Sequence, residues 1–304
     1  MHIPEHMING PVCPVTAVLA AAAIGSAFYF AGKTEKKPSP SLFAAVAALI
    51  FAAQMLNFPI GGGTSGHYLG AAFAAIVLGT PFGIMAMALV VTVQALVFSD
   101  GGLFILGANI LNMAVIGAGV SGFIYGWFFK DKNDIIMKTS GIFFLSFISV
   151  ISSAAVCSLE LSISGIASVR EIFGVMLPVH SLIGMAEAVM TVFFAVVLAG
   201  LPKVSEIKFP RKMFMIICAF AMAAVLSHFA SVLPDGLEYS AGTLGLLSEN
   251  RPLFVTPLSD YSLFGSRYFL AVSAAGIAGV AIVAGISYLA GLIIGKKKNL
   301  RTVE

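Results

Sequence analysis

The chain has 304 residues, a net charge of +3 and a mean hydropathy of +1.00, with 59% hydrophobic and only 10% charged residues. Soluble globular domains contain roughly 45–50% apolar and about 25% charged residues, so this composition excludes an ordinary soluble protein. The three cysteines, Cys13, Cys157 and Cys218, form no C-x-x-C pair and specify neither a disulfide framework nor a zinc site. We therefore expect a polytopic membrane protein.

Long apolar stretches define the expected membrane spans, because a helix needs about 20 apolar residues to cross roughly 30 Å of hydrocarbon. The sequence predicts an all-α fold with about nine transmembrane helices. A "GTPFG" turn containing Pro81 separates the third and fourth spans, which are short. The expected spans are 13–32, 41–57, 67–80, 82–98, 105–129, 137–160, 176–200, 212–231 and 267–294.

The basic residues predict how the chain is oriented. With the N-terminus outside and the C-terminus cytoplasmic, fourteen of the seventeen lysines and arginines lie on the cytoplasmic side, as the positive-inside rule requires. Only Arg170, Arg251 and Arg267 then lie outside. The small positive charge therefore reflects membrane orientation, and we expect membrane lipid but no nucleic acid as a partner.

The stretch "GGGTSGHY", residues 61–68, resembles a phosphate-binding loop with the wrong ending. Gly61 and Gly66 keep the glycine spacing of G-x-x-x-x-G-K-[ST], but His67 and Tyr68 stand where the lysine and the serine or threonine should be. In the expected orientation this loop faces outward, where ATP is absent. The chain is therefore expected to have no ATPase activity of its own.

The opening "MHIPEHM" has the chemistry of a metal chelator. It lacks the basic and apolar regions of a signal peptide, so we expect it to be retained. The Met1 amine, the His2 amide and His2 Nδ1 can fill three corners of a square, and one further nitrogen completes a planar site suited to Ni(II) or Cu(II). His67 lies on the same expected side. The alternative is a flexible glycine loop with a surface histidine.

Four blocks within residues 1–200 carry a family resemblance: "MHIPE", "FPIGGGTSGHYLGAAFAAIVLGTPFG", "VQALVFSDGGLFILGANILNMAVIGA" and "VHSLIGMAEAVMT". They resemble the CbiM/NikM family, the substrate-binding membrane components of energy-coupling-factor (ECF) importers for nickel and cobalt. The resemblance implies that Met1, His2 and His67 hold the transported Ni(II) or Co(II). It also implies a bacterial cytoplasmic (inner) membrane location, a transmembrane coupling subunit similar to EcfT, NikQ or CbiQ, and cytosolic ATPases similar to NikO or CbiO.

The opening departs from the family's commoner "MHIPDG", because Glu5 and His6 follow the proline. His6 is either an additional metal ligand or, more simply, a surface histidine.

The end of the chain carries a second resemblance. "LPDGLEYSAG" and "PLSDYSLFGS" resemble the PDGLE-type accessory component, similar to NikN or CbiN, that accompanies these proteins. We expect a metal-binding domain at 1–205 and an accessory domain at 206–304, with two helices flanking an outer loop at 232–266. Asp235, Glu238 and Asp260 make that loop acidic, either to attract cations or as ordinary solvated charges.

Polar residues within or beside the expected spans need partners, since ionisable groups in hydrocarbon cost roughly 2.5–3.5 kcal/mol or more. His180 and Glu187 lie seven residues apart on one helical face, which suits a packing hydrogen bond or a role around the metal. Others are candidates to hold the N-terminal segment, because metal ligands are usually oriented by outer hydrogen bonds. These candidates are Gln54, Asn57, Asp100, Asn109 and Asn112.

Alanines 44, 48 and 52 form a stripe of small residues, which indicates either internal packing or a surface for the coupling subunit.

Two other classes of function stay open. An intramembrane metalloenzyme is disfavoured because no H-E-x-x-H motif occurs and four nitrogen ligands would leave no equatorial position for water. A carrier or sensor that acts without ATPase partners fits the same metal site. Nitrogen ligands suit both nickel and cobalt, so the sequence does not choose between them.

Overall fold

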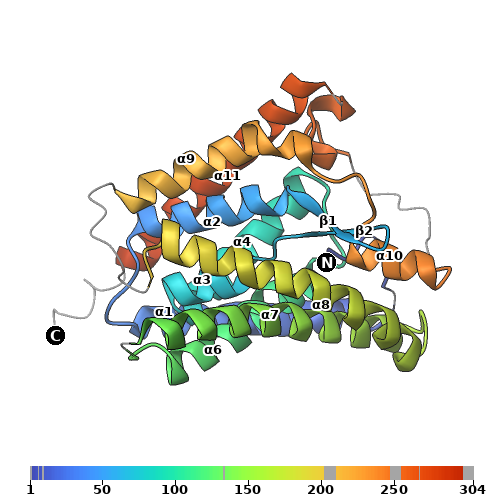
Figure 1. Ribbon diagram of the computed structural model, residues 1–304, viewed down its shortest axis with the longest axis horizontal. Helices are drawn as coiled ribbons and strands as arrows, with labels where there is room; N and C mark the ends of the chain where they lie inside the picture. The colour runs from blue at the N-terminus through green and yellow to red at the C-terminus, as the bar shows by residue number, and fades with distance from the viewer. Residues whose placement is uncertain are drawn as a thin grey trace.

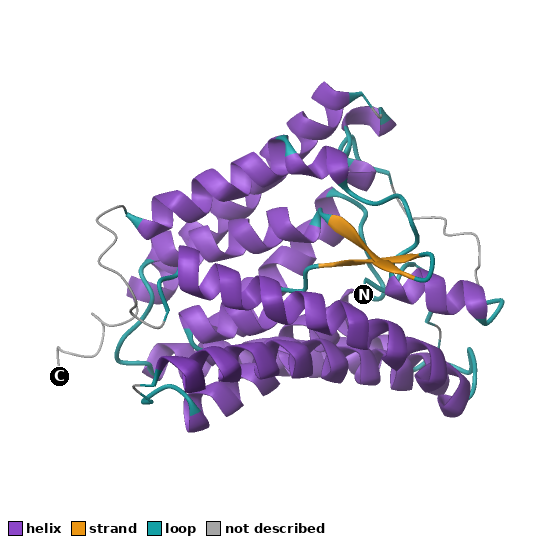
Figure 2. Cartoon of the chain, viewed as in Figure 1, coloured by secondary structure: helices purple, strands orange, loops and turns teal. Residues whose placement is uncertain are grey.

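The computed structural model describes residues 2–5, 7–8, 10–132, 134–201, 210–246, 255–266 and 268–296. The chain forms a bundle of helices with a small β-hairpin at one end, beside a short helix, α10 (Gly236–Thr243) (Figure 1). Within the described residues, the β-structure consists of this two-stranded hairpin (Figure 2). The protein is thus mostly helical, and the all-α expectation is wrong at the hairpin.

Six helical segments among the described residues are long and apolar enough to cross a membrane. The chain is therefore a multi-pass membrane protein. The six segments are α1 (Val12–Lys33), α4 (Thr80–Val97), Leu106–Phe128, α7 (Ile135–Ile163), Val169–Leu198 and α11 (Phe269–Lys296). Two of these segments are composite. The segment Leu106–Phe128 consists of α5 (Leu106–Asn109), the π-helix η1 (Ile110–Ile116) and α6 (Gly117–Phe128). The segment Val169–Leu198 consists of α8 (Val169–Phe193) and the π-helix η2 (Phe194–Leu198).

Three of the nine expected spans correspond to shorter helices, so nine full spans are not confirmed. They are α2 (Pro40–Gln54), α3 (Ala71–Leu78) and α9 (Arg211–Ala224). Helix α3 is short because Gly70 and Gly79, at its two ends, have φ values of 78° and 88°, which an α-helix cannot continue. Residues 67–70 of the expected third span belong to the hairpin and the corner that follows it.

Helix α2 lies inside the molecule. Every residue from Phe43 to Gln54 is buried, and α9 and α11 pack against it. Glycines in α11 allow this close approach, since a Cβ added at Gly279 would lie 2.4 Å from the Phe51 ring. The alanine stripe of α2 therefore serves internal packing, and its interpretation as a surface for a coupling subunit is wrong.

The glycine-rich loop is the β-hairpin, β1 (Asn57–Gly61) and β2 (Thr64–His67). The strands are antiparallel and pair Asn57 with His67. Gly61, Gly62 and Gly63 have φ values of 94°, 63° and 81°, a conformation that favours glycine, so the run of glycines makes the turn of the hairpin. The hairpin places His67 at the end of β2, next to the helix bundle.

The expected outer loop of the accessory domain is partly helical. After α9 come the 3₁₀ turn η3 (Leu226–Phe229), α10, and the 3₁₀ turns η4 (Ser259–Tyr261) and η5 (Leu263–Gly265). The PDGLE sequence starts α10 with a capping box, in which Asp235 accepts from the N–H groups of Leu237 and Glu238, and Glu238 accepts from the Asp235 N–H. The expected domain boundary at 205/206 lies outside the described residues.

Candidate metal centre

The structure brings the rings of His2 and His67 together. Their centroids are 5.5 Å apart and their planes make an angle of 28°, although 65 positions separate the two residues in the chain. Both side chains are about nine-tenths buried, with 8% and 10% of their surface exposed. Met1 and His6, the other nitrogen donors named from the sequence, lie outside the described residues.

The C-terminal end of α4 holds the His2 ring. His2 Nε2 lies 3.0 Å from Gln94 Oε1, while His2 Nδ1 lies 3.6 Å from Asp100 Oδ1. Gln94 Nε2 donates to Gln54 Oε1 at 2.8 Å, which orients the Gln94 amide so that its oxygen faces His2. The His2 Nε2 must then donate, so Nδ1 is the unprotonated nitrogen, the form that binds a metal.

The His67 ring has a comparable arrangement. Its Nδ1 lies 3.2 Å from the Tyr68 carbonyl oxygen, which only accepts, and its Nε2 lies 3.9 Å from Asp235 Oδ2. With the proton on Nδ1, Nε2 carries the lone pair. Each histidine thus directs an unprotonated nitrogen, of the kind that can bind a metal, toward a carboxylate.

Burial sets the charges of these groups. It lowers the pKa of His67 to about 3, and it lowers the pKa of His2 despite the opposite effect of Asp100. Burial alone would raise the pKa of Asp235, but nearby positive charge and the hydrogen bond from the Glu238 N–H outweigh it, and the pKa is lowered. At neutral pH the centre therefore contains two neutral imidazoles beside a carboxylate.

Two helices fix the corner that follows His67. Gln54 of α2 donates to the Leu69 carbonyl at 2.7 Å. The Glu187 carboxylate of α8 accepts from the Leu69 and Gly70 N–H groups at 2.7 and 2.8 Å. The sequence-predicted residues Gln54 and Glu187 thus act on the backbone just after His67, which restricts where its ring can lie.

The segment after His2 is fixed in the same way. Asn109 accepts from the Ile3 N–H at 2.8 Å and donates to the Ile3 carbonyl at 3.1 Å. The Glu5 carboxylate accepts from the N–H groups of Leu103 and Phe104. A Cβ added at Gly102 would lie 2.6 Å from Glu5 Oε2, so the glycine is what lets the N-terminal segment pack here.

Three other sequence-predicted residues have contacts of their own. Asn112 donates to Glu160 between two helices and does not hold the N-terminal segment. Asn57 is the residue of β1 that pairs with His67 in the hairpin. His180 Nδ1 bonds the Met176 carbonyl at 2.8 Å. Its Nε2 is buried and has no hydrogen-bond partner in the described part of the chain.

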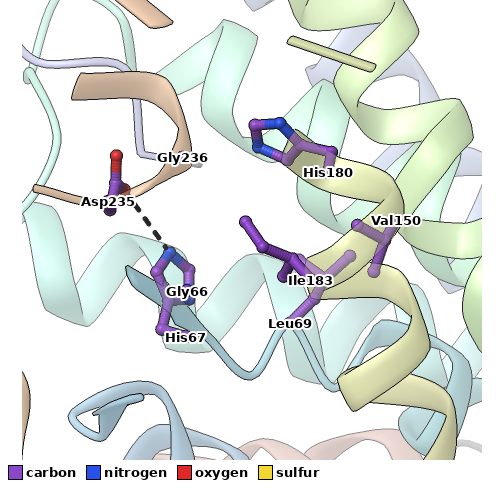
Figure 3. Close-up of a pocket in the computed structure, with 8 residues that line it drawn as sticks. All are labelled: Gly66, His67, Leu69, Val150, His180, Ile183, Asp235 and Gly236. Atoms are coloured by element: carbon purple, nitrogen blue, oxygen red, sulfur yellow. Dashed lines mark ion pairs between the residues drawn. The ribbon is translucent and has the colours of Figure 1, made fainter. Parts of the chain in front are cut away.

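Figure 3 shows His180 and the His67–Asp235 pair around one small cavity. The cavity measures about 10 Å³, close to the size of one water molecule. Gly236 also lines it, and a Cβ added there would lie 3.0 Å from His180 Cε1. The PDGLE segment, through Asp235 and Gly236, therefore packs directly against the helix that carries His180.

A larger cavity of about 300 Å³ lies over the histidine pair. Both histidines line it, together with four carboxylates, Asp100, Asp235, Glu238 and Asp260. A negative lining of this kind attracts cations. Among the residues that the structure describes, no group of three His, Cys, Asp or Glu side chains is arranged to hold a metal ion by itself.

Sequence reasoning missed two residues at this centre, Gln94 and Tyr261. Gln94 is an amide in the apolar stretch "VTVQALVF", and the argument used for Gln54 would have found it. Tyr261 donates its hydroxyl to Asp100 Oδ2 across 161 positions of sequence. Nothing in the local pattern around Tyr261 indicates that contact.

Comparison with known proteins agrees with this architecture. Residues 2–204 match CbiM, the cobalt uptake substrate-specific transmembrane region, and residues 211–296 match the PDGLE domain. A putative fused nickel transport protein NikMN from Archaeoglobus fulgidus is 36% identical over 95% of this chain and 97% of its own. A cobalt transport protein CbiM from Lachnoclostridium phytofermentans is 29% identical over 66% of this chain and 82% of its own.

A solved structure has a similar fold. The crystal structure of a truncated transition metal transporter superimposes with a TM-score of 0.57 at 27% identity, covering 66% of this chain and 99% of that one. The chain belongs to the CbiM family of nickel and cobalt transport proteins and carries a PDGLE domain after the CbiM region.

Proposed function

We propose that the chain is the substrate-specific component of an ECF-type importer and captures Ni(II) or Co(II) at the outer membrane face. The observation that carries the proposal is the pairing of two buried, neutral histidines, each with one nitrogen oriented as a metal ligand. The ligands in this proposal are the Met1 amine, the His2 amide and Nδ1, and His67 Nε2. The ion is the transported substrate.

The surroundings support capture rather than catalysis. Gln94, Gln54 and Asn109 hold the two ligand-bearing segments by hydrogen bonds, which suits a site that must be preorganised. Four planar nitrogen ligands leave no equatorial position for a reactive water. The carboxylates that line the larger cavity would draw cations toward the histidines, as a capture site requires.

Delivery across the membrane requires partners in this proposal. A transmembrane coupling subunit and cytosolic ATPases would supply the energy, with the N-terminus of this chain outside and its C-terminus cytoplasmic. The chain would comprise a metal-binding unit at 1–205 and an accessory unit at 206–304. The membrane is the bacterial cytoplasmic membrane.

The direct test extends the N-terminus. The full chain in detergent is titrated with Ni(II) by calorimetry and visible absorption, beside a variant with one glycine before Met1 and a His67→Ala variant. We expect a yellow, diamagnetic square-planar centre in the native protein and loss of binding in both variants. Unchanged binding in the extended protein would exclude the Met1 amine as a ligand, and the planar chelate would then be rejected.

A further inference from the structure

The loop that ends α4 carries a carboxylate to the coordinating edge of His2. Gln94, in the last turn of α4, binds Nε2 of the ring, and Asp100, three residues after the helix ends, faces Nδ1. Between them the chain turns sharply, because Ser99 has a φ of 55° and Gly101 a φ of 85°. A non-glycine residue with such a φ is strained and stays there only when its surroundings hold it.

The surroundings that hold this loop come from the accessory domain. Residues 256–261, which we call the clamp, contact four consecutive residues, 97–100. Thr256 donates its hydroxyl to the Val97 carbonyl, and the Asp260 N–H donates to the Phe98 carbonyl at 3.0 Å. Carbonyls at the end of a helix lack partners within the helix, so the clamp supplies the missing donors.

Two side-chain contacts complete the clamp. The hydroxyls of Ser259 and Ser99 lie 2.9 Å apart, and Tyr261 donates its hydroxyl to Asp100 Oδ2 at 2.5 Å. Tyr261 is also anchored through its ring, which stacks on Phe98 with centroids 4.8 Å apart and planes at 15°. The ring is therefore fixed, and the hydroxyl has a defined position relative to Asp100.

Tyr261 occupies one oxygen of Asp100 and so determines where the other points. With Oδ2 accepting from Tyr261, Oδ1 is the oxygen 3.6 Å from His2 Nδ1. Without the hydroxyl, the carboxylate can rotate away from the ring edge. A carboxylate held at this place supplies negative charge beside a cation bound to Nδ1.

We propose that Tyr261 is a positioning residue for metal capture, which acts by holding Asp100 against the metal-binding edge of His2. This inference rests on the proposed function, since it takes His2 Nδ1 as a ligand. It assigns a role to the segment "PLSDYSLFGS" that is distinct from that of the PDGLE sequence. The clamp thereby links the accessory domain to the N-terminal segment.

The test compares Tyr261→Phe with the native full chain in detergent, titrated with Ni(II) chloride. The phenylalanine keeps the stacking on Phe98 and removes only the hydroxyl. We expect Ni(II) affinity to fall about tenfold, the lower end of the effect of losing an outer partner of a ligand. The thermal midpoint of the metal-free protein should stay unchanged. The matched control is Tyr268→Phe, because Tyr268 is 83% exposed in the same domain, and it should bind as the native protein does.

A double-mutant cycle separates positioning from packing. Asp100→Asn should itself weaken Ni(II) binding, and adding Tyr261→Phe to it should cause no further loss, because the hydroxyl acts through the carboxylate. Additive losses, or native affinity in Tyr261→Phe, would overturn the inference. If Tyr261→Phe also lowers the thermal midpoint, the comparison within the Asp100→Asn background still isolates the hydroxyl.

The His67→Ala variant, titrated in parallel, tells the two failures apart. Loss of binding in His67→Ala with native binding in Tyr261→Phe rejects only the role of Tyr261. Native binding in His67→Ala rejects the metal site itself.

Discussion

At the scale of single residues, the chemistry of the site depends on which nitrogen of each histidine carries the proton. Gln94 Oε1 and the Tyr68 carbonyl accept hydrogen bonds and fix opposite nitrogens in the two rings, Nε2 of His2 and Nδ1 of His67. Burial keeps both rings neutral by lowering their pKa values. Both imidazoles of the proposed site are therefore neutral before a cation binds, and binding would not need to displace a proton from either ring.

This charge state predicts how Ni(II) binding depends on pH. A pKa of about 3 for His67, and a value below 6.5 for His2, mean that neither ring titrates between pH 7 and 9. In the proposed site, the Met1 amine, whose ordinary pKa is about 7.7–8.0, and the His2 backbone amide must still lose protons to the metal. Affinity should therefore rise with pH over this range, measured by calorimetry at fixed ionic strength.

The Tyr268→Phe variant provides the control for this dependence, because Tyr268 is 83% exposed and outside the proposed centre. It should bind Ni(II) with the native affinity and show the same change with pH. A transition centred near pH 6.5 in the native protein would contradict the prediction, because it would show imidazoles that titrate as exposed groups.

At the scale of elements, the proposed metal centre lies where the hairpin, α8 and α10 meet. The Ser65 N–H donates to the Pro234 carbonyl at 2.8 Å, and its hydroxyl donates to the Leu233 carbonyl at the same distance. Asp235 starts α10 and faces His67 with its second oxygen. The PDGLE sequence therefore combines a helix cap, a close packing contact and a carboxylate at the centre.

Gly236→Ala tests this packing. The added Cβ would lie 2.7 Å from Ile183 Cδ1 and 3.0 Å from His180 Cε1, and overpacking of this kind typically costs about 1–3 kcal/mol. We expect a lower thermal midpoint in detergent and weaker Ni(II) binding, because Asp235 moves with its neighbour. Gly285→Ala is the control, since a Cβ there meets nothing within 4 Å. Equal behaviour of the two variants would show that α10 tolerates displacement.

At the scale of the whole molecule, the CbiM region and the PDGLE domain pack as one structure. Helices α9 and α11 cover α2, which is buried from Phe43 to Gln54, so the helices of the PDGLE domain bury a surface of the CbiM region. The alanines of α2 are accordingly occupied by contacts within the chain. The coupling subunit of the proposed importer would therefore dock on other helices.

Transport assays test the proposed dependence on partners. The chain reconstituted alone in vesicles should bind Ni(II) but not accumulate it. Addition of the coupling subunit and the ATPases should give uptake that requires ATP, measured as ⁶³Ni retained after washing. An ATPase variant without activity is the control. Accumulation by the chain alone would favour the carrier alternative.

The amino-acid sequence by itself determined the class of protein and the candidate ligands. The lengths of the apolar segments and the positions of the basic residues are local features of the sequence, so they indicate membrane helices without knowledge of the fold. His2 and His67 stand out by their chemistry and by the resemblance to a known family. The tertiary structure decided the rest. It shows that the loop "GGGTSGH" forms a hairpin, that six segments of the described residues are long enough to cross a membrane, and that the alanine stripe is buried. Gln94 and Tyr261 reach the centre through contacts between distant parts of the chain, and local patterns do not encode such contacts.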